Sequence, residues 1–167
     1  IGETYCVYNS RTGEIAEKIE ITKENKVKTA AKAAESGEKA EGMTYEKALE
    51  LASTKLHIHT TSDNVKVATS VDVLVLAIKP QFFETVIKEI SEQIPKTTLI
   101  ISIAAGQSLK KIETLFERTL KIIRCMPNTP ALVSEGITAV CPNDEVSKEE
   151  MALVMKLLGG FGIAEQV

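Results

Sequence analysis

The sequence predicts an α/β protein in which a mainly parallel sheet carries helices on both faces. Two observations support this fold class. Apolar runs rich in β-branched residues recur at residues 71–78, 98–103 and 120–125, and such runs suit strands that are buried on both faces. Segments with an apolar stripe at helical spacing separate these runs, and the connections are short. Strands that alternate with helices over short connections form parallel sheets.

The helices are expected in chain order from residue 45 onward. Apolar residues gather on one side of four segments, at residues 45–55, 81–94, 109–116 and 147–158. A shorter helix is expected to begin at Ser62-Asp63-Asn64, because the Ser and Asp side chains can cap free amide groups. Ser147 and Glu150 have the spacing of a capping box at the start of the last helix.

Shorter strands and one irregular segment complete the pattern. Residues 56–60 alternate in polarity, residues 137–140 form a short apolar run, and residues 162–167 are expected to be an edge strand. Residues 1–8 could supply another strand. Residues 22–42 are rich in Lys, Glu and Ala and poor in large apolar residues, which predicts a solvated helix or a mobile segment.

This order of elements predicts a single doubly wound, Rossmann-like domain over residues 1–167, atypical over residues 1–44. Ligands of such sheets bind beyond the carboxyl ends of the strands. The loops after Ile78, Ile103 and Cys125 are therefore the candidates for a binding site.

Two of these loops have features that suit a ligand and also fit ordinary turns. Pro80 lacks an amide hydrogen and restricts Lys79, so the strand stops sharply and the backbone could lie along a ligand. The same pair equally fits a helix that begins with proline. After Ile103, the small residues 104–106 would let a ligand approach the backbone, and the next helix would offer amide donors. A tight strand-to-helix turn would have the same composition.

The third loop carries two prolines. Met126-Pro127-Asn128-Thr129-Pro130-Ala131 follows the strand that ends at Cys125. The prolines are expected to hold Asn128 and Thr129 in a stiff arrangement, and a stiff polar loop can position a small ligand at low entropic cost.

Composition and motifs exclude several kinds of function. A net charge of −3 without any run of Lys or Arg offers no basic surface to nucleic acid. No apolar segment is long enough to span a bilayer, and no signal peptide is expected. The spacing of Cys6, Cys125 and Cys141 fits no zinc motif and favours reduced thiols in the cytoplasm. His57 and His59 have no third ligand at suitable spacing, so no metal site is expected. The sequence also lacks a Walker loop and a Gly-x-Gly-x-x-Gly turn.

Three segments in this order resemble pyrroline-5-carboxylate reductase. They read VDVLVLAIKPQ over residues 71–81, LIISIAAG over residues 99–106 and KIIRCMPNTPALVSEGITAV over residues 121–140. The last segment is specific, because Met-Pro-Asn-Thr-Pro-Ala in this context is typical of that family. The resemblance runs from about Tyr45 to Val167, roughly three-quarters of the chain, and does not include residues 1–44.

The resemblance implies the final step of proline biosynthesis, with NADP or NAD as cofactor and NADPH slightly preferred. Hydride would pass to the C=N bond of 1-pyrroline-5-carboxylate and give L-proline. Asn64 would lie near the adenosine, and Ala77, Ile78, Lys79 and Pro80 would line the dinucleotide. Ile103 and Ala105 would lie on the nicotinamide side. Asn128, Thr129 and Pro130 would border the nicotinamide and the substrate pocket. No catalytic acid or base is assigned, and Lys79 is expected to act by position.

Two departures from the family's pattern leave other functions open. Residues 1–44 show no glycine-rich turn for the pyrophosphate. In the family, a C-terminal helical domain forms the dimer and supplies substrate-binding groups, and this domain is expected to be absent here. A full-length protein with that domain is expected to be a homo-oligomer. A nucleotide-binding module without catalysis, or a related imine or ketone reductase with another substrate, remains an alternative.

Overall fold

A six-stranded sheet organises the part of the chain that the computed structural model describes, residues 3–5, 19–21, 27–30, 54, 61 and 63–167. Neighbouring strands pair in parallel except β6 and β7. In order across the sheet, the strands are β3 (Val27–Ala30), β4 (Val73–Leu76), β5 (Leu99–Ser102), β6 (Lys121–Pro127), β7 (Gly136–Pro142) and β8 (Gly162–Gln166). The predicted mainly parallel sheet is confirmed, and residues 162–167 do supply an edge strand.

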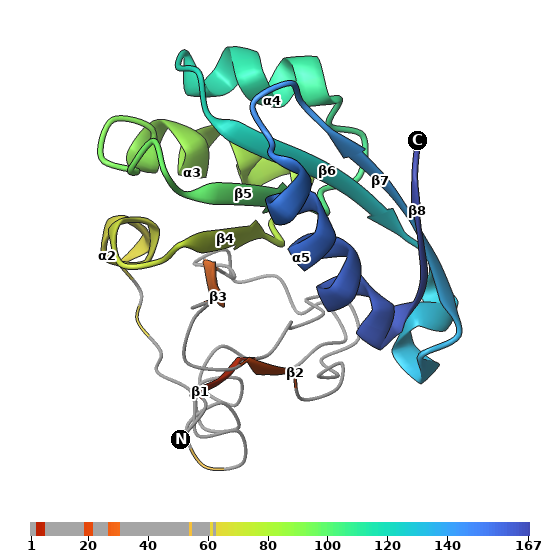
Figure 1. Cartoon of the computed structure of the whole chain (residues 1–167). Helices are drawn as coiled ribbons and strands as arrows, with labels where there is room; N and C mark the ends of the chain where they lie inside the picture. The colour runs from red at the N-terminus through yellow and green to blue at the C-terminus, as the bar shows by residue number, and fades with distance from the viewer. Residues whose placement is uncertain (1–2, 6–18, 22–26, 31–53, 55–60, 62) are drawn as a thin grey trace.

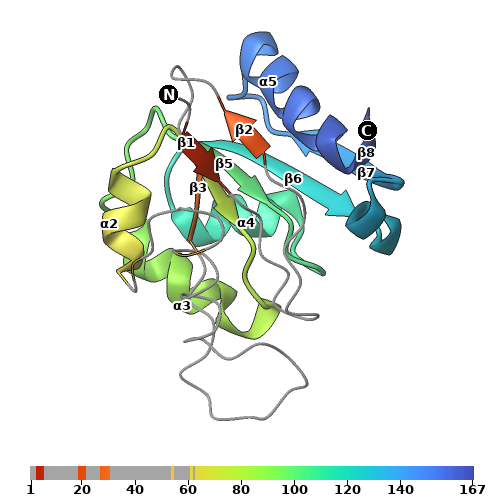
Figure 2. The ribbon, with the colours of Figure 1, turned by 90° about the horizontal axis from the view of Figure 1, so that it is seen from below.

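Helices cover both faces of this sheet, as expected for a doubly wound domain (Figures 1 and 2). One face carries α2 (Asn64–Thr69), α3 (Pro80–Ile90) and α4 (Leu109–Phe116), and the other carries α5 (Lys148–Leu158). Two short 3-10 turns, η1 (Thr129–Val133) and η2 (Gly159–Phe161), precede β7 and β8. In the described residues, no helix is long and apolar enough to cross a membrane.

The strands are buried on both faces because their side chains alternate between two apolar clusters. Leu74, Ile100 and Ile122 face the helices α2, α3 and α4, whereas Val75 and Ile123 face α5. Burial of each such side chain stabilises the fold by about 1.5–3 kcal/mol. All four residues of β4 are buried, which explains why its sequence reads as a continuous apolar run.

Several predicted boundaries shift. The helix expected over residues 81–94 ends at Ile90, where the Arg118 guanidinium donates to the carbonyl oxygens of Ser91 and Ile94. The strand expected to end at Cys125 continues to Pro127. The expected helix over residues 45–55, the strand over residues 56–60 and the two histidines lie outside the described residues.

The first strand of the large sheet was not predicted. Val27–Ala30 falls in the stretch for which the composition indicated a solvated helix or a mobile segment, and for these four residues that prediction was wrong. Val27 pairs with Val73 and Ala30 with Leu76. The open edge of β4 offers a ladder partner, and such non-local pairing outweighs a weak local preference. The strand expected in residues 1–8 is present as β1 (Glu3–Tyr5), paired with β2 (Ile19–Ile21) in a separate antiparallel sheet.

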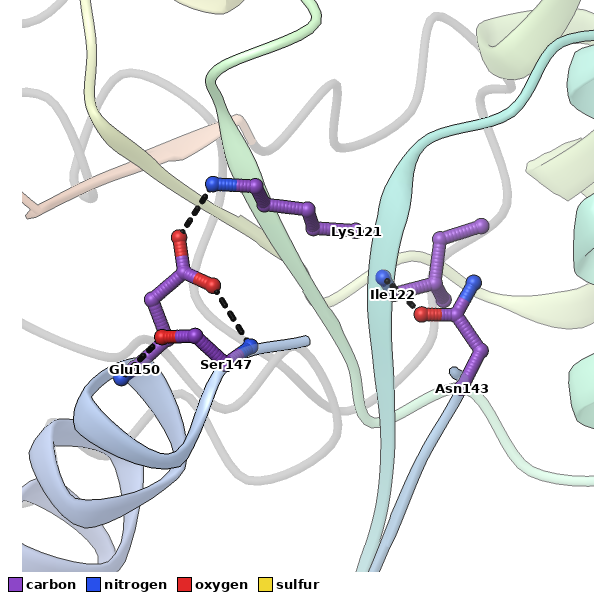
Figure 3. Close-up of polar contacts among 5 residues, drawn as sticks. All are labelled: Lys121, Ile122, Asn143, Ser147 and Glu150. Atoms are coloured by element: carbon purple, nitrogen blue, oxygen red, sulfur yellow. Dashed lines mark hydrogen bonds and ion pairs between the residues drawn. The ribbon is translucent and has the colours of Figure 1, made fainter. Parts of the chain in front are cut away.

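The start of α5 is fixed by the predicted capping box (Figure 3). Ser147 Oγ accepts from the Glu150 amide at 3.2 Å, and Glu150 Oε2 accepts from the Ser147 amide at 2.9 Å. Glu150 Oε1 also pairs with Lys121 Nζ of β6 at 2.5 Å, which ties the helix to the sheet. Burial raises the pKa of Glu150, but the hydrogen bonds from Lys121 and Ser147 and the charge of Lys121 outweigh it and hold this pKa below its ordinary value.

This lowered pKa makes part of the stability depend on pH. The folded state binds the Glu150 proton more weakly than the unfolded chain, so the contribution is complete above the ordinary carboxyl pKa of about 4.3 and is lost as the pH falls further. Glu150→Gln keeps a capping oxygen but loses the charge. We expect urea unfolding to show the wild type as the more stable protein at pH 7, with the difference shrinking below about pH 4.3. Parallel stability profiles for the two proteins would contradict this assignment.

Candidate functional site

The carboxyl ends of β4 and β5 lie level with each other and with Arg124 of β6. Leu76 of β4 pairs with Ser102 of β5, and Ser102 pairs with Arg124 of β6. Just beyond this level, the Ile103 amide donates to the Leu76 carbonyl oxygen at 3.2 Å. The loops after β4 and β5 therefore start side by side, as the sequence predicts.

The loop after β4 leads directly into a helix. Ala77 and Lys79 are half-buried, Ile78 is buried, and Pro80 is the exposed first residue of α3. Lys79 has extended backbone angles of φ −60° and ψ 140°, and its side chain makes no capping hydrogen bond. Proline therefore begins the helix here, and the positive end of the α3 dipole faces the carboxyl edge without a side-chain cap.

The loop after β5 leaves open space at the same edge. Ala105 is exposed, and Gly106 has a positive φ of 71° with no atom within 4 Å of where a Cβ would lie. Arg124 Nε donates to the Gln107 carbonyl oxygen at 2.8 Å, which holds the end of the loop to β6. Ser108 Oγ caps α4 by accepting from the Lys111 amide at 3.2 Å. Small residues on a fixed backbone let a flat ligand approach closely.

The third predicted loop stands further out than the other two. β6 runs on through Cys125, Met126 and Pro127 after β5 has ended, so the loop begins at Asn128 rather than at Met126. Asn128, Thr129 and Pro130 are all exposed. Asn128 Oδ1 accepts from the Ile137 amide at 2.9 Å, so this side chain is attached to β7.

The structure does not bring Asn64 to these loops. Asn64 is buried at the start of α2, and its Nδ2 donates to Glu89 Oε2 at 2.8 Å. α3 begins at the carboxyl edge with Pro80, and Glu89 lies near its other end. Asn64 therefore connects α2 to α3, and its predicted place near the adenosine stays a prediction.

Comparison with known proteins agrees with this geometry. A family model described as "NADP oxidoreductase coenzyme F420-dependent" matches residues 2–106. The chain belongs to this family. The matched residues include residues 2–44, over which the motifs carry no resemblance to pyrroline-5-carboxylate reductase.

The relatives include pyrroline-5-carboxylate reductases, and the part they share with this chain is their N-terminal NADP-binding domain. The enzyme of Escherichia coli strain K12 is 41% identical over 102 residues, which are 61% of this chain and 38% of the relative. A pyrroline-5-carboxylate reductase structure from Coxiella burnetii is 30% identical with a TM-score of 0.71, and the match covers 84% of this chain and 48% of that one. The Plasmodium falciparum pyrroline carboxylate reductase, solved with NADP bound, shares the fold at a TM-score of 0.61 and 24% identity, over 84% of this chain and 46% of that one. The chain spans less than half the length of these relatives.

Cys125 lies in the core of this NADP-binding domain and not in its site. Burial raises the pKa of its thiol to about 12, although the neighbouring charge of Arg124 acts in the opposite direction. The side chain is fully buried in the apolar cluster beneath α5. Within residues 63–167 and the other described positions, no group of three or more His, Cys, Asp or Glu could hold a metal ion.

Gln107 is a buried polar residue that the sequence analysis missed. Its side chain is 6% exposed, and its Oε1 has no hydrogen-bond partner in the structure. Its place immediately before the Ser108 cap, after a run of small residues, gave no sign of burial. A buried acceptor without a partner costs about 1–3 kcal/mol.

The raised pKa of Cys125 predicts an unreactive thiol. The thiolate is the nucleophile, and at pH 8 a pKa near 12 leaves a thiolate fraction on the order of one in ten thousand. We expect iodoacetamide to label the half-exposed Cys141 in the native protein and Cys125 only after unfolding in urea, as read by peptide mass spectrometry. Equal native labelling of the two thiols would show that Cys125 is accessible.

The unpartnered oxygen of Gln107 predicts a stabilising substitution. Gln107→Leu removes the unsatisfied acceptor and keeps most of the side-chain volume, so we expect the free energy of unfolding to rise by about 1–2 kcal/mol in urea titrations. Gln107→Glu, which places a charge in the same buried position, serves as the control and is expected to destabilise the protein. A loss of stability in the Leu variant would mean that the carboxamide is hydrogen-bonded in solution.

Proposed function

We propose that this chain is the cofactor-binding part of a pyrroline-5-carboxylate reductase. The proposed reaction transfers hydride from NADPH or NADH to the C=N bond of 1-pyrroline-5-carboxylate and yields L-proline. The observation that carries the proposal is the grouping at one sheet edge of the loops whose sequences resemble that family, residues 77–80, 103–106 and 128–130. The 41% identity to the Escherichia coli enzyme supports it.

The residues at this edge fit the nicotinamide half of a dinucleotide. The open space beside Gly106 and the exposed Ala105 would admit a flat ring against the backbone. The backbone of residues 77–80, at the uncapped start of α3, would lie along the dinucleotide and favour its negative charge. When bound, the cofactor supplies the hydride.

The work left to the protein is positioning. A protonated imine is already electrophilic, so a rate increase comes mainly from holding the two reactants in contact and from electrostatics. Ala105 would support one side of the ring, and Thr129 and Pro130 would limit access of water from the other. Lys79 contributes position and positive charge and is not assigned as an acid or base.

The substrate would be a small molecule, bound with the help of a C-terminal helical domain through which the full-length protein would form a homo-oligomer. We place the protein in the cytoplasm, where its cysteines would be reduced.

A cofactor-binding module without catalysis is the second candidate. The sequence has no Gly-x-Gly-x-x-Gly turn, which other proteins of this fold use to hold the pyrophosphate. Weak or absent dinucleotide binding would favour this candidate.

Titration of the chain with NADPH and NADH, followed by nucleotide fluorescence, tests the proposal. We expect saturable binding at micromolar concentrations. Ala105→Leu should weaken it at least tenfold by filling the space for the ring, and should leave the melting temperature unchanged because Ala105 is exposed. Ala152→Leu, at an exposed position of α5 on the opposite face, is the matched control and should bind like the wild type.

Failure of both dinucleotides to bind would overturn the cofactor assignment. With 1-pyrroline-5-carboxylate and NADPH, we expect weak or no turnover from this chain alone. Turnover comparable to that of a full-length reductase would show that the rest of the relatives' sequence is not needed for catalysis.

A further inference from the structure

At the carboxyl edge, the last hydrogen bond between β6 and β7 is accepted by a side chain instead of a backbone carbonyl. Pro127 pairs with Thr138, so the next position places Asn128 opposite Ile137. There, Asn128 Oδ1 accepts the Ile137 amide hydrogen at 2.9 Å. The side-chain carboxamide thus takes the place of a main-chain carbonyl at the end of the ladder.

Because the Asn128 side chain accepts this bond, the main chain of Asn128 is not bound to β7. Its carbonyl oxygen accepts from the Ala131 amide at 3.1 Å, which begins the η1 turn, and its side chain makes no capping bond to that turn. If Ile137 had no side-chain partner, its amide would compete for the same backbone carbonyl. The direction in which Thr129 and Pro130 leave the sheet therefore depends on one oxygen atom.

Close packing then holds the turn against β7. Gly136 is buried, and a Cβ on it would lie 2.7 Å from Ala131 Cα, so only glycine allows this approach. The Glu135 amide donates to the Pro130 carbonyl oxygen at 3.1 Å. The η1 turn is attached to β7 at its start, through Asn128, and again at its end.

The opposite end of the same ladder has a matching arrangement (Figure 3). Ile123 pairs with Pro142, and at the next position Asn143 Oδ1 accepts from the Ile122 amide at 3.1 Å. Asn143 Nδ2 donates to the Leu120 carbonyl oxygen at 2.9 Å. This asparagine lies at the amino end of β6, away from the candidate site. It therefore provides an internal control for the loss of a ladder-ending carboxamide.

We propose that Asn128 is a positioning residue of the dinucleotide site and acts through Oδ1. By ending the β6–β7 ladder, it holds Thr129 and Pro130 over the carboxyl edge, where the nicotinamide ring would lie. The inference rests on the proposed function. It also gives Asn128 a different task from direct contact with the ligand, which would use the Nδ2 donor.

Three variants separate these tasks. Asn128→Ala removes both atoms, and Asn128→Asp keeps an accepting oxygen but loses the donor. Asn143→Ala removes the equivalent carboxamide at the other end of the ladder. Each variant is titrated with NADPH and with 2′-phospho-ADP-ribose, which lacks the nicotinamide ring.

We expect Asn128→Ala to raise the dissociation constant for NADPH about tenfold and to change that for 2′-phospho-ADP-ribose less than about twofold. Asn128→Asp should bind NADPH within about threefold of the wild type, because the ladder-ending acceptor is kept. Asn143→Ala should lower the melting temperature and leave both dissociation constants within about twofold. This pattern is not expected from a general loss of stability.

Other patterns would overturn the inference. Equal losses of NADPH affinity in Asn128→Asp and Asn128→Ala would assign the effect to Nδ2 and direct contact. Equal losses in Asn128→Ala and Asn143→Ala would assign it to stability, and no loss in Asn128→Ala would remove the role altogether.

Amide hydrogen exchange tests the positioning role of Asn128 separately from the proposed function. If the wild type binds no dinucleotide, the proposed function fails, but exchange still tests the positioning. We expect Asn128→Ala to speed exchange at Ala131 and Ile137 at least tenfold, and Asn143→Ala to leave both rates unchanged. Unchanged rates in Asn128→Ala would overturn the positioning role with or without a cofactor.

Discussion

The level pairing of β4, β5 and β6 is the constraint on which the rest of the structure depends. Because these strands are apolar on both faces, alternation of polar and apolar residues cannot fix their register. Hydrogen bonds at the amino ends of β4 and β5 hold this pair in register. Thr98 Oγ1, which is buried, donates to the Val71 carbonyl oxygen at 3.2 Å, and the Leu99 amide donates to that of Asp72 at 2.8 Å. With the amino ends fixed in this way, Leu76 and Ser102 end level, and the two loops that follow start from the same line.

The single antiparallel pairing in the large sheet has a different effect. β6 and β7 extend beyond the end of β5, so the connection between them overhangs the carboxyl edge instead of lying level with it. A parallel pair would need a long crossover to return the chain. The antiparallel pair returns it through the short η1 turn, and the two asparagine side chains define where the pairing starts and stops. Strand length and ladder ends thereby decide how far Thr129 stands above the neighbouring loops.

The sequence is informative where local chemistry decides the structure. The Ser147–Glu150 capping box, the Asp63 cap and the apolar strands are visible as residue patterns, and both caps and the approximate strand positions agree with the structure. β3 could not be seen in this way, because its four residues form a strand only by pairing with β4. Asn128 shows the same limit at the site. Its type and its place between two prolines mark it as a candidate, but its bond to Ile137 depends on the register of two strands.

The placement of charge at helix starts differs between the two edges of the sheet. α5 begins at the amino edge of β6 and carries Glu149 and Glu150 in its first turn, as the helix dipole favours. α3 and α4 begin at the carboxyl edge and have no acidic residue there. The first turn of α4 carries Lys110 and Lys111 instead, against the preference of the dipole. In a chain with a net charge of −3, the starts of these two helices thus carry no carboxylate, and such helix starts suit an anionic ligand such as a dinucleotide.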